Sequence, residues 1–170
     1  MSPYWVVRTG RLVLSPVSFA DLADLTSLKS DPRVFAIMLG GVRTPERTAE
    51  ELAEDITFWG AHGVGMWAAR DANAGTFLGY VGMHDRPDHG AIALRFAFVT
   101  NSQGRGYASE AAGAVLRFAH DQAGLTRVIA VARASNIGSR QVLGAIGMTE
   151  CRAFDRDGER VLVYESQRRR

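Results

Sequence analysis

The residues best suited to chemistry lie in one segment, residues 98–110, where a strand-like run passes through a short turn into a helix. Gly104 and Gly106 in this turn permit backbone conformations and close approaches that a Cβ atom would block. Several N–H groups can then point into one concavity at the start of the helix, and such an arrangement binds phosphate. Arg105 adds a positive charge suited to a pyrophosphate or a ribose phosphate. An ordinary tight connection between strand and helix explains the two glycines equally well.

Two known phosphate-binding motifs are poor matches to this turn. A P-loop is excluded, because the sequence has no Gly-x4-Gly-Lys-Ser/Thr and its only lysine, Lys29, is distant. A dinucleotide-binding fingerprint needs a third small residue, which Ser109 weakly supplies, and an acidic residue about 20 positions later, which is missing. Arg133 at the end of the following strand leaves an NADP interpretation open. That fold, however, normally starts its parallel sheet with this unit.

The spacing of apolar, turn and capping residues predicts the elements that position this segment. The expected strands are 11–15, 65–70, 76–83, 91–99, 127–132, 148–154 and 160–165, and the expected helices are 18–29, 44–59, 106–122 and 136–146. The fold class is therefore α+β, with a mixed, mostly antiparallel sheet of about seven strands flanked by four helices and one parallel βαβ step at its centre.

The strand expected at 91–99 has two different faces. Bulky residues share one face and small residues share the other, apart from Arg95. The bulky residues are Ile92, Leu94, Phe96 and Phe98, and the small ones are Ala91, Ala93, Ala97 and Val99. We interpret the bulky face as core. The small face either leaves space for a substrate or packs closely against a helix.

The composition describes one soluble globular domain over residues 1–170, with a short disordered tail expected at 167–170. A formal charge of +2 and a hydrophobic share of 46% exclude collagenous, disordered and disulfide-scaffold classes. No apolar run approaches the ~20 residues that cross a bilayer and no secretory signal is found, so we expect a cytoplasmic protein with no membrane partner. The basic residues are scattered except at the C-terminus, so direct nucleic-acid binding is not expected. The lone Cys151 and the histidines predict no metal site.

Two motifs carry a resemblance to a known family. Gln103-Gly-Arg-Gly-Tyr-Ala108 fits the Gln/Arg-x-x-Gly-x-Gly/Ala pyrophosphate loop of the GNAT superfamily of acyl-CoA-dependent N-acetyltransferases, so the chain resembles these enzymes. Asn136-Ile-Gly-Ser139, followed by Leu143-Gly-Ala-Ile-Gly-Met148, is similar to the second signature of the Rim-type subgroup, named for ribosomal-protein N-terminal acetyltransferases. The resemblance covers nearly the whole chain.

The resemblance implies a site for acetyl-CoA as co-substrate, with no metal, between a strand that splays from its parallel neighbour and the loop. Backbone groups of 98–100 would pair with the pantetheine arm, and amides of 103–108 would hold the pyrophosphate. Asn136 would contact the pantetheine or an ordered water, although it is also a good helix N-cap without any ligand. Ser139 would lie near the thioester sulfur. The expected coenzyme-binding residues are Phe98, Val99, Thr100, Gln103, Gly104, Arg105, Gly106, Tyr107, Ala108, Asn136 and Ser139.

Acetyl transfer to nitrogen needs a neutral amine, a polarised thioester carbonyl and a departing thiol. The expected catalytic residues are Val99, whose backbone N–H would polarise the carbonyl, Ser139, which would donate a proton, and Asn136. Many relatives use a tyrosine seven residues after the asparagine, where this chain has Leu143.

The general base is not evident from the sequence. Relatives with a carboxylate on the two central strands would have it where this chain has Ala93 and Val131. The open candidates are His84, Asp85, His89 and an acid from the first two expected helices. We assign Glu110, in a helix's first turn, to the helix dipole instead. Without a strong base, an α-amine of pKa ~8 is an easier acceptor than a lysine of pKa ~10.4.

We therefore expect an N-acetyltransferase that moves an acetyl group from acetyl-CoA to a primary amine by direct attack in a ternary complex. The acceptor is a small-molecule amine or a protein N-terminus. The missing tyrosine and strand carboxylates leave a second function open, a non-catalytic acyl-CoA-binding or sensing domain. A homodimer is expected from family habit alone.

Overall fold

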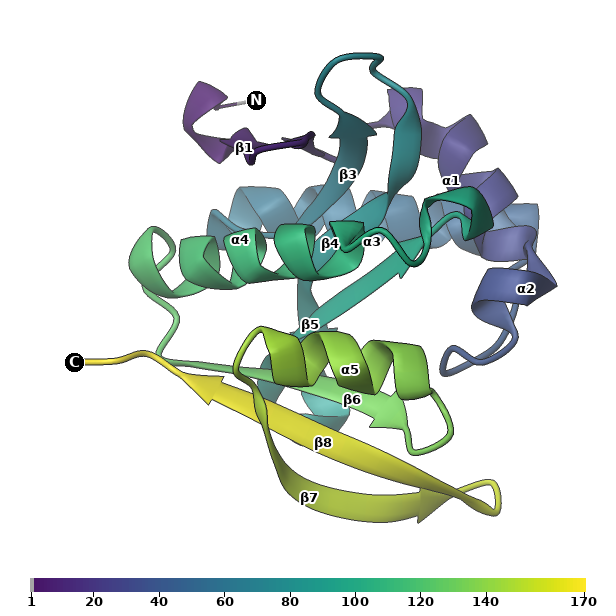
Figure 1. Ribbon diagram of the computed structural model, residues 1–170, viewed down its shortest axis with the longest axis vertical. Helices are drawn as coiled ribbons and strands as arrows, with labels where there is room; N and C mark the ends of the chain where they lie inside the picture. Colours follow the sequence, from purple (N-terminus) through teal and green to yellow (C-terminus); the bar gives the residue numbers. More distant parts are fainter. Residues whose placement is uncertain (1) are drawn as a thin grey trace.

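The structure is a computed structural model that describes residues 2–170. An eight-stranded sheet, ordered β1-β2-β3-β4-β5-β6-β8-β7, carries helices on both faces (Figure 1). The strands are β1 Val7–Arg8, β2 Leu12–Pro16, β3 Met66–Asp71, β4 Phe77–Arg86, β5 Ala91–Phe98, β6 Arg127–Arg133, β7 Thr149–Arg156 and β8 Glu159–Gln167. The α-helices are α1 Leu22–Ser30, α2 Pro32–Phe35, α3 Pro45–His62, α4 Tyr107–Asp121 and α5 Ile137–Ala145. Within residues 2–170, no helix has the length and apolar character needed to cross a membrane.

Capping residues set the helix boundaries, and α3 starts where the sequence predicts but continues three residues past the expected end at 59, to His62. α3 begins after Thr44, whose side chain accepts a hydrogen bond from a first-turn amide, and Pro45 occupies the first helical position. The helix ends at Gly63, which has a φ of 65°. Asn136 caps α5 by accepting a hydrogen bond from the Ser139 amide at 3.2 Å.

Two short elements add to the seven strands and four helices expected. β1 has two residues, too few for a periodic pattern, and pairs with β2 through Val7 and Leu14. α2 is a single turn. Asp31 ends α1, as Pro32 predicts, but Pro32 then takes the first position of α2. The Asp31 side chain caps this turn by accepting a hydrogen bond from the Arg33 amide at 2.9 Å.

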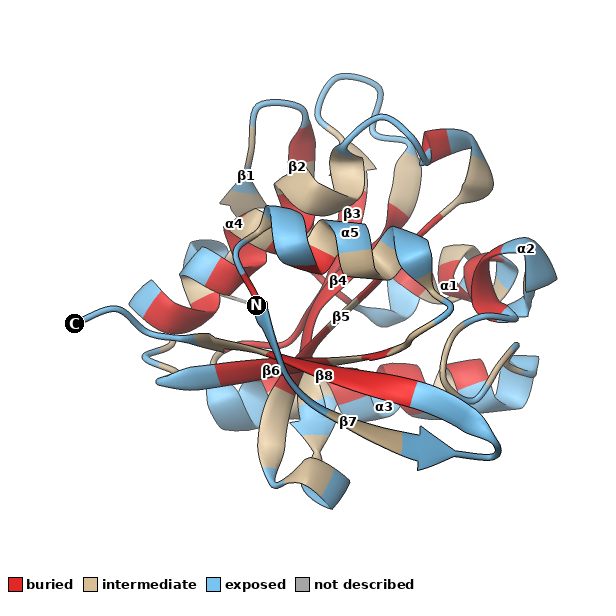
Figure 2. Ribbon diagram, turned by 60° about the horizontal axis from the view of Figure 1, so that its bottom comes forward, coloured by how far each residue is buried: buried red, intermediate tan, exposed pale blue. Residues whose placement is uncertain are grey.

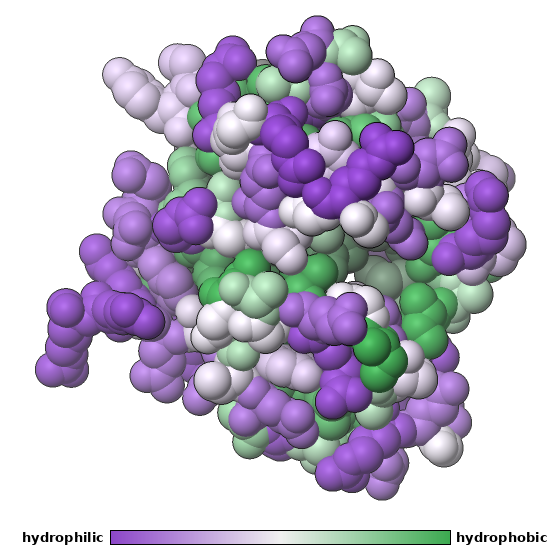
Figure 3. Space-filling model, viewed as in Figure 1, coloured by the Kyte–Doolittle hydropathy of each residue, from purple (hydrophilic) through white to green (hydrophobic). Residues whose placement is uncertain are grey.

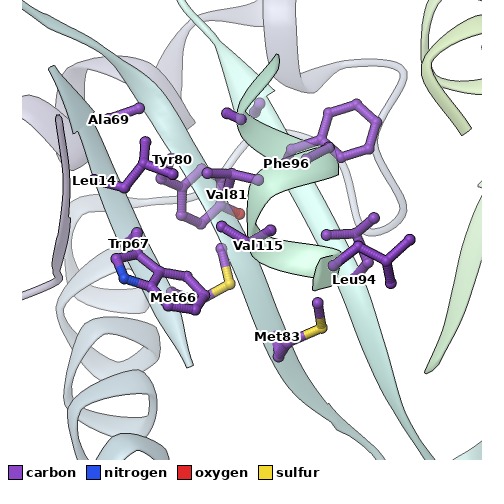
Figure 4. Packing of buried hydrophobic residues seen from close by; sticks show 14 of the residues in the cluster. Leu14, Met66, Trp67, Ala69, Tyr80, Val81, Met83, Leu94, Phe96 and Val115 are labelled. Atoms are coloured by element: carbon purple, nitrogen blue, oxygen red, sulfur yellow. The ribbon is translucent and has the colours of Figure 1, made fainter. Parts of the chain in front are cut away.

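One face of the central strands packs under α4. The register places Trp67 opposite Val81 and Val81 opposite Phe96, so these three side chains share a face. Figure 4 shows them in the apolar core with Val115 of α4. The Trp67 ring meets the Phe118 ring of α4 edge to face, with 5.2 Å between centroids. This packing holds α4 across the sheet directly after β5.

The opposite face of β4 and β5 lies against α1 and α3 and is buried too. Ala93 and Ala97 are 1% and 5% exposed. The side chain of Arg95, on the same face of β5, pairs with Asp55 of α3 at 2.9 Å. Close packing of helices therefore accounts for most of the small-residue face, and a small cavity beside Ala93 and Arg95 is the space that remains there.

β5 and β6 are parallel and meet at one register pair, Ala93 with Ile129, whereas β6 pairs with β8 through seven. The splayed central pair is confirmed, and Figure 1 shows the two strands diverging. At their contact, Ala93 and Ile129 form a second small core with Val163 of β8. Phe154 of β7 packs against this core. The His89 ring, at the tip of the β4–β5 hairpin, contacts the Phe154 ring, with 5.4 Å between the ring centroids. Figure 2 shows β6 and β8 buried along the middle of the sheet and β7 exposed.

Candidate active site

Two adjoining cavities occupy the opening between the splayed ends of β5 and β6. The larger, of about 760 Å³, lies between the N-terminal ends of α4 and α5. Figure 3 shows this face of the molecule hollowed between the two helices, with apolar residues around the hollow. The smaller, of about 90 Å³, is lined by β4, β5 and β6. Phe96, Asn136 and Ser139 line both cavities, so the cavities meet at these residues.

Most of the expected coenzyme residues line the larger cavity. They are Phe98, Gln103, Gly104, Gly106, Tyr107, Ala108, Asn136 and Ser139. Val99, Thr100 and Arg105 are not among its lining residues. Arg33 of α2 lines it as well, although α2 itself was not expected from the sequence.

The glycine loop presents free backbone donors to the larger cavity. Gly104 and Gly106 have φ of 77° and 80°, so both need the left-handed conformation that glycine tolerates. Gly106 is the N-cap of α4 and supplies no side-chain cap. Within residues 2–170, the amides of 104–109 donate no hydrogen bond to another carbonyl or side chain. A row of unpaired N–H groups at the positive end of a 15-residue helix suits an anion such as pyrophosphate.

Glu110 fastens the first turn of α4 to the β1–β2 connection. Its carboxylate accepts hydrogen bonds from the Thr9 hydroxyl at 2.5 Å and from the Arg11 Nε at 2.8 Å. Burial opposes ionisation of Glu110, but these bonds outweigh burial and lower the pKa of its carboxyl. The Arg11 guanidinium also lies over the Tyr107 ring, 4.2 Å from its centroid. Glu110 therefore positions the loop and is not available as a base.

The backbone N–H of Val99, predicted to polarise the thioester, already has a partner within the fold. It donates to the Leu78 carbonyl of β4 at 2.8 Å, and the Val99 carbonyl accepts from the Ser102 amide at 3.0 Å. In an antiparallel pair, successive residues direct their backbone groups to opposite sides. The N–H groups of Phe96 and Phe98 therefore point away from β4, into the opening toward β6.

Of the bases that the sequence left open, His84 alone lines the smaller cavity. Asp85 is exposed, and His89 contacts β7 at the hairpin tip. Among the described residues, no acid of α1 or α3 lines this cavity. The two buried acids of α3 near β5, Glu51 and Asp55, are held in ion pairs instead.

The surroundings of His84 keep its imidazole neutral. Burial lowers its pKa well below 6.5, and the charges of Arg95, Arg86 and Lys29 lower it further. A neutral imidazole accepts hydrogen bonds and has a free lone pair for a proton, so His84 can serve as an acceptor for an amine that is being acylated, but its lowered pKa makes it a weak base.

Comparison with known proteins assigns the family. Residues 11–149 match the family model of the acetyltransferase (GNAT) domain. The chain belongs to this family. The match includes the glycine loop and the Asn136–Ser139 segment, so the resemblance based on those motifs is confirmed. GNAT acetyltransferases use acetyl-CoA, and this GNAT domain is an acyltransferase.

This GNAT domain is similar to several acetyltransferases over most of its length. It is 28% identical over 144 residues to the uncharacterised N-acetyltransferase YnaD of Bacillus subtilis (strain 168), covering 84% of this chain and 81% of YnaD. An acetyltransferase structure from Agrobacterium tumefaciens str. C58 matches with a TM-score of 0.85 at 28% identity, covering 95% and 94% of the two chains. RimL, a ribosomal L7/L12 alpha-N-protein acetyltransferase in complex with coenzyme A, shares the fold with a TM-score of 0.78 at 15% identity, covering 95% and 97%.

Sequence reasoning missed the charged side chains around the smaller cavity of this GNAT domain. Arg43, Arg86, Arg95 and Arg133 all line it. No motif contains the first three, and Arg133 was considered only for an NADP site. The alternation of β5 was the one available signal, because it places Arg95 on a face of small residues.

Proposed function

We propose that this GNAT enzyme binds acetyl-CoA in the larger cavity and a primary amine in the smaller one, and transfers the acetyl group between them in a ternary complex. The observation that carries the proposal is the row of unpaired amides at 104–109, which faces a cavity of about 760 Å³. That cavity opens at Phe96, Asn136 and Ser139 onto a second cavity, where an acceptor can approach.

The coenzyme contacts follow from the chemistry of each group. The amides of 104–108 would hold the pyrophosphate at the start of α4. The pantetheine arm would lie along β5 and pair with backbone groups of Phe98, whose carbonyl already accepts from the Gln103 side chain at 3.0 Å. Asn136 would contact the arm where the two cavities meet.

The amide of Phe96 is the donor best placed to polarise the thioester carbonyl. Phe96 lines both cavities, and its N–H points into the opening between β5 and β6. A backbone donor held by a strand stabilises the charge that develops on the carbonyl oxygen without rearranging. This assignment replaces Val99.

The remaining steps need one proton acceptor and one donor. The amine nitrogen attacks the carbonyl carbon, the C–S bond breaks, and the sulfur leaves with its electron pair. His84 would accept the proton that the amine loses, directly or through water. Ser139 would donate a hydrogen bond to the departing sulfur. Leu143, only 1% exposed, lines the smaller cavity and offers no hydroxyl for this task.

The acceptor is a primary amine, either a protein N-terminus or a small molecule. RimL, an alpha-N-protein acetyltransferase with the same fold, supports an amine acceptor, although it shares only 15% identity with this chain. A homodimer stays a prediction.

The test combines binding with turnover. Calorimetry with coenzyme A should show binding, and incubation with acetyl-CoA and an amine panel should release free thiol above background. Binding without release from any amine would favour the non-catalytic acyl-CoA sensor, and absence of binding would refute both functions.

A further inference from the structure

Four arginines, three from different strands and one from the loop before α3, surround the smaller cavity. Arg86 ends β4, Arg95 lies within β5, Arg133 ends β6, and Arg43 precedes α3. Among the described residues, no aspartate or glutamate lines this cavity. His84 also lines this cavity, and its lowered pKa keeps the imidazole neutral. The cavity is therefore lined by positive charge alone.

Three of these guanidinium groups have a hydrogen-bond donor left over. The Nε atoms of Arg86, Arg95 and Arg133 are buried and have no partner among the described residues. Their side chains are 16%, 19% and 24% exposed, so water reaches them poorly. A buried donor without an acceptor is costly, and most such groups in folded proteins have a partner. All three arginines line the same cavity, so a group rich in hydrogen-bond acceptors bound there would lie beside guanidinium groups that have donors to spare.

The carboxylates near these arginines do not account for the whole positive charge. Arg43 and Arg95 share Glu51 and Asp55 with a third cation, the buried Lys29. Three cations therefore face two carboxylates on this side.

The other two arginines have partners at the surface. Arg86 pairs with Asp88 and Arg133 pairs with Glu159, whose side chains are 59% and 50% exposed. Solvent weakens such pairs. Each also engages an Nη atom of its arginine and leaves the buried Nε free.

We propose that the acceptor amine carries a carboxylate group a few bonds from its nitrogen, and that Arg86, Arg95 and Arg133 bind that carboxylate in the smaller cavity. The inference rests on the proposed acetyl transfer and names its acceptor class. Guanidinium groups match carboxylate geometry and form charge-assisted hydrogen bonds with it. A cavity of about 90 Å³ suits a small acid-bearing amine.

The same charges assist the reaction. Positive groups around an ammonium favour its neutral, reactive form. An arginine-lined cavity therefore orients the acceptor through its carboxylate and helps to release the proton that blocks attack.

Matched acceptor pairs test the proposal by turnover. Alanine and β-alanine are each compared with the corresponding carboxamide, with acetyl-CoA present and free thiol as the readout. The carboxamides have the more acidic ammonium groups, because they lack a neighbouring negative charge, so intrinsic reactivity at neutral pH favours them. A higher kcat/KM for at least one carboxylate therefore supports recognition by the enzyme.

Two variants test the residues. Arg86→Gln and Arg133→Gln each remove one guanidinium whose partner is exposed, so folding should persist. Each should lower kcat/KM for the carboxylate acceptor by roughly 10- to 100-fold, as expected for the loss of a hydrogen bond to a charged group. The KM for acetyl-CoA should stay unchanged, and the kcat/KM for the carboxamide should fall several-fold less than that for the carboxylate, because the carboxamide loses only the effect of the positive charge on its ammonium group. Arg156→Gln, on the exposed strand β7, is the control and should change none of these values.

Direct binding keeps the two proposals separate. Calorimetry with N-acetylalanine and N-acetyl-β-alanine, and with their carboxamides, reads the carboxylate site whether or not turnover occurs. Equal kcat/KM for acids and amides, with no preferential binding of the acids, overturns the carboxylate proposal while acetyl transfer stands. Preferential binding of an acid that Arg86→Gln or Arg133→Gln weakens, in a protein without coenzyme affinity, supports the carboxylate site and refutes the proposed function.

Discussion

Replacing Asp55 by asparagine should destabilise the fold far more than a matched change at the surface. The Asp55 carboxylate accepts from the Arg95 Nη2 at 2.9 and 3.0 Å, and its side chain is 7% exposed. Asparagine keeps the shape and one oxygen but removes the charge. The carboxylate that remains beside Arg95 is then that of Glu51, at 3.9 Å, and Glu51 also forms an ion pair with Lys29.

The expected loss follows from the burial of this pair. Removing one partner of a buried ion pair costs about 3–5 kcal/mol, because the other charge is left uncompensated. A domain of this size loses about 2–4 °C of melting temperature per kcal/mol, so Tm should fall by roughly 6–20 °C. Burial opposes the positive charge of Arg95, but Tyr80, Asp55 and Glu51 outweigh burial and raise the pKa of its guanidinium. Asp55→Asn removes one of these groups, but an arginine guanidinium keeps its proton in proteins, so Arg95 cannot escape the cost by becoming neutral.

The control lies on the same helix. Glu54 pairs with Arg47 at 3.1 Å, but their side chains are 63% and 47% exposed. Glu54→Gln should cost no more than about 1 kcal/mol. Urea unfolding at pH 7 gives the free energy of unfolding of both variants. A double replacement, Asp55→Leu with Arg95→Met, should recover much of the stability lost in Asp55→Asn, because an apolar pair leaves no buried charge.

One result would refute this reasoning. If Asp55→Asn and Glu54→Gln lose the same small amount of stability, the Arg95–Asp55 contact is weak, and Arg95 is solvated in a way that its burial does not suggest.

Three further changes have distinct readouts. Gly104→Ala and Gly124→Ala place a Cβ atom at similar φ of 77° and 73° with no neighbour within 4 Å, so each should cost about 1–2 kcal/mol of strain. In calorimetry, Gly104→Ala should weaken coenzyme A binding about 5- to 30-fold, because binding must return the strained loop to its original conformation. The affinity of the Gly124→Ala variant should be unchanged. Equal affinities of the two variants would contradict the role of the loop. The unfolded chain takes up a proton at His84 below pH ~6.5 and the folded chain does not, so urea stability should fall from pH 6.5 to 5. His84→Gln should reduce that slope, and an unchanged slope would show that His84 is not responsible. Glu110→Gln should lower the melting temperature at pH 7 and reduce the acid-induced loss of stability below pH ~4.5, because the folded state keeps this carboxyl ionised. Identical pH profiles of the variant and the unchanged protein would show that Glu110 does not contribute to the acid-induced loss.

Local sequence signals predicted the elements that frame the site. Thr44 with Pro45, and Asn136, are short-range caps whose function depends on their own helix, so their positions were readable. Gly104 and Gly106 were predicted for their conformational freedom, and both have positive φ. The two-residue β1 and the single-turn α2 were missed, because neither is long enough for a period to repeat.

The parts of the site that depend on distant contacts were not readable. Whether the Val99 amide is free depends on which side of β5 faces β4, and that register is fixed by the whole hairpin. The partners of Arg95 come from α3, about 40 residues away in the chain, and no short motif encodes that meeting. Leu143 was recognised as a departure from the family's tyrosine, and in the structure it lines the smaller cavity, where it offers no hydroxyl for the departing sulfur.

β5 and β6 share a single register pair, Ala93 with Ile129, and the opening between the two strands widens away from that point. Each strand is held firmly on its other side, because β5 pairs with β4 through eight register pairs and β6 pairs with β8 through seven. The two strands diverge from the point where the small Ala93 meets the branched Ile129. Because strand side chains point to the faces of the sheet, a bulkier side chain at Ala93 would fill the smaller cavity and press on the second small core, so the range of acceptors can change in evolution through this one position while the coenzyme loop stays the same.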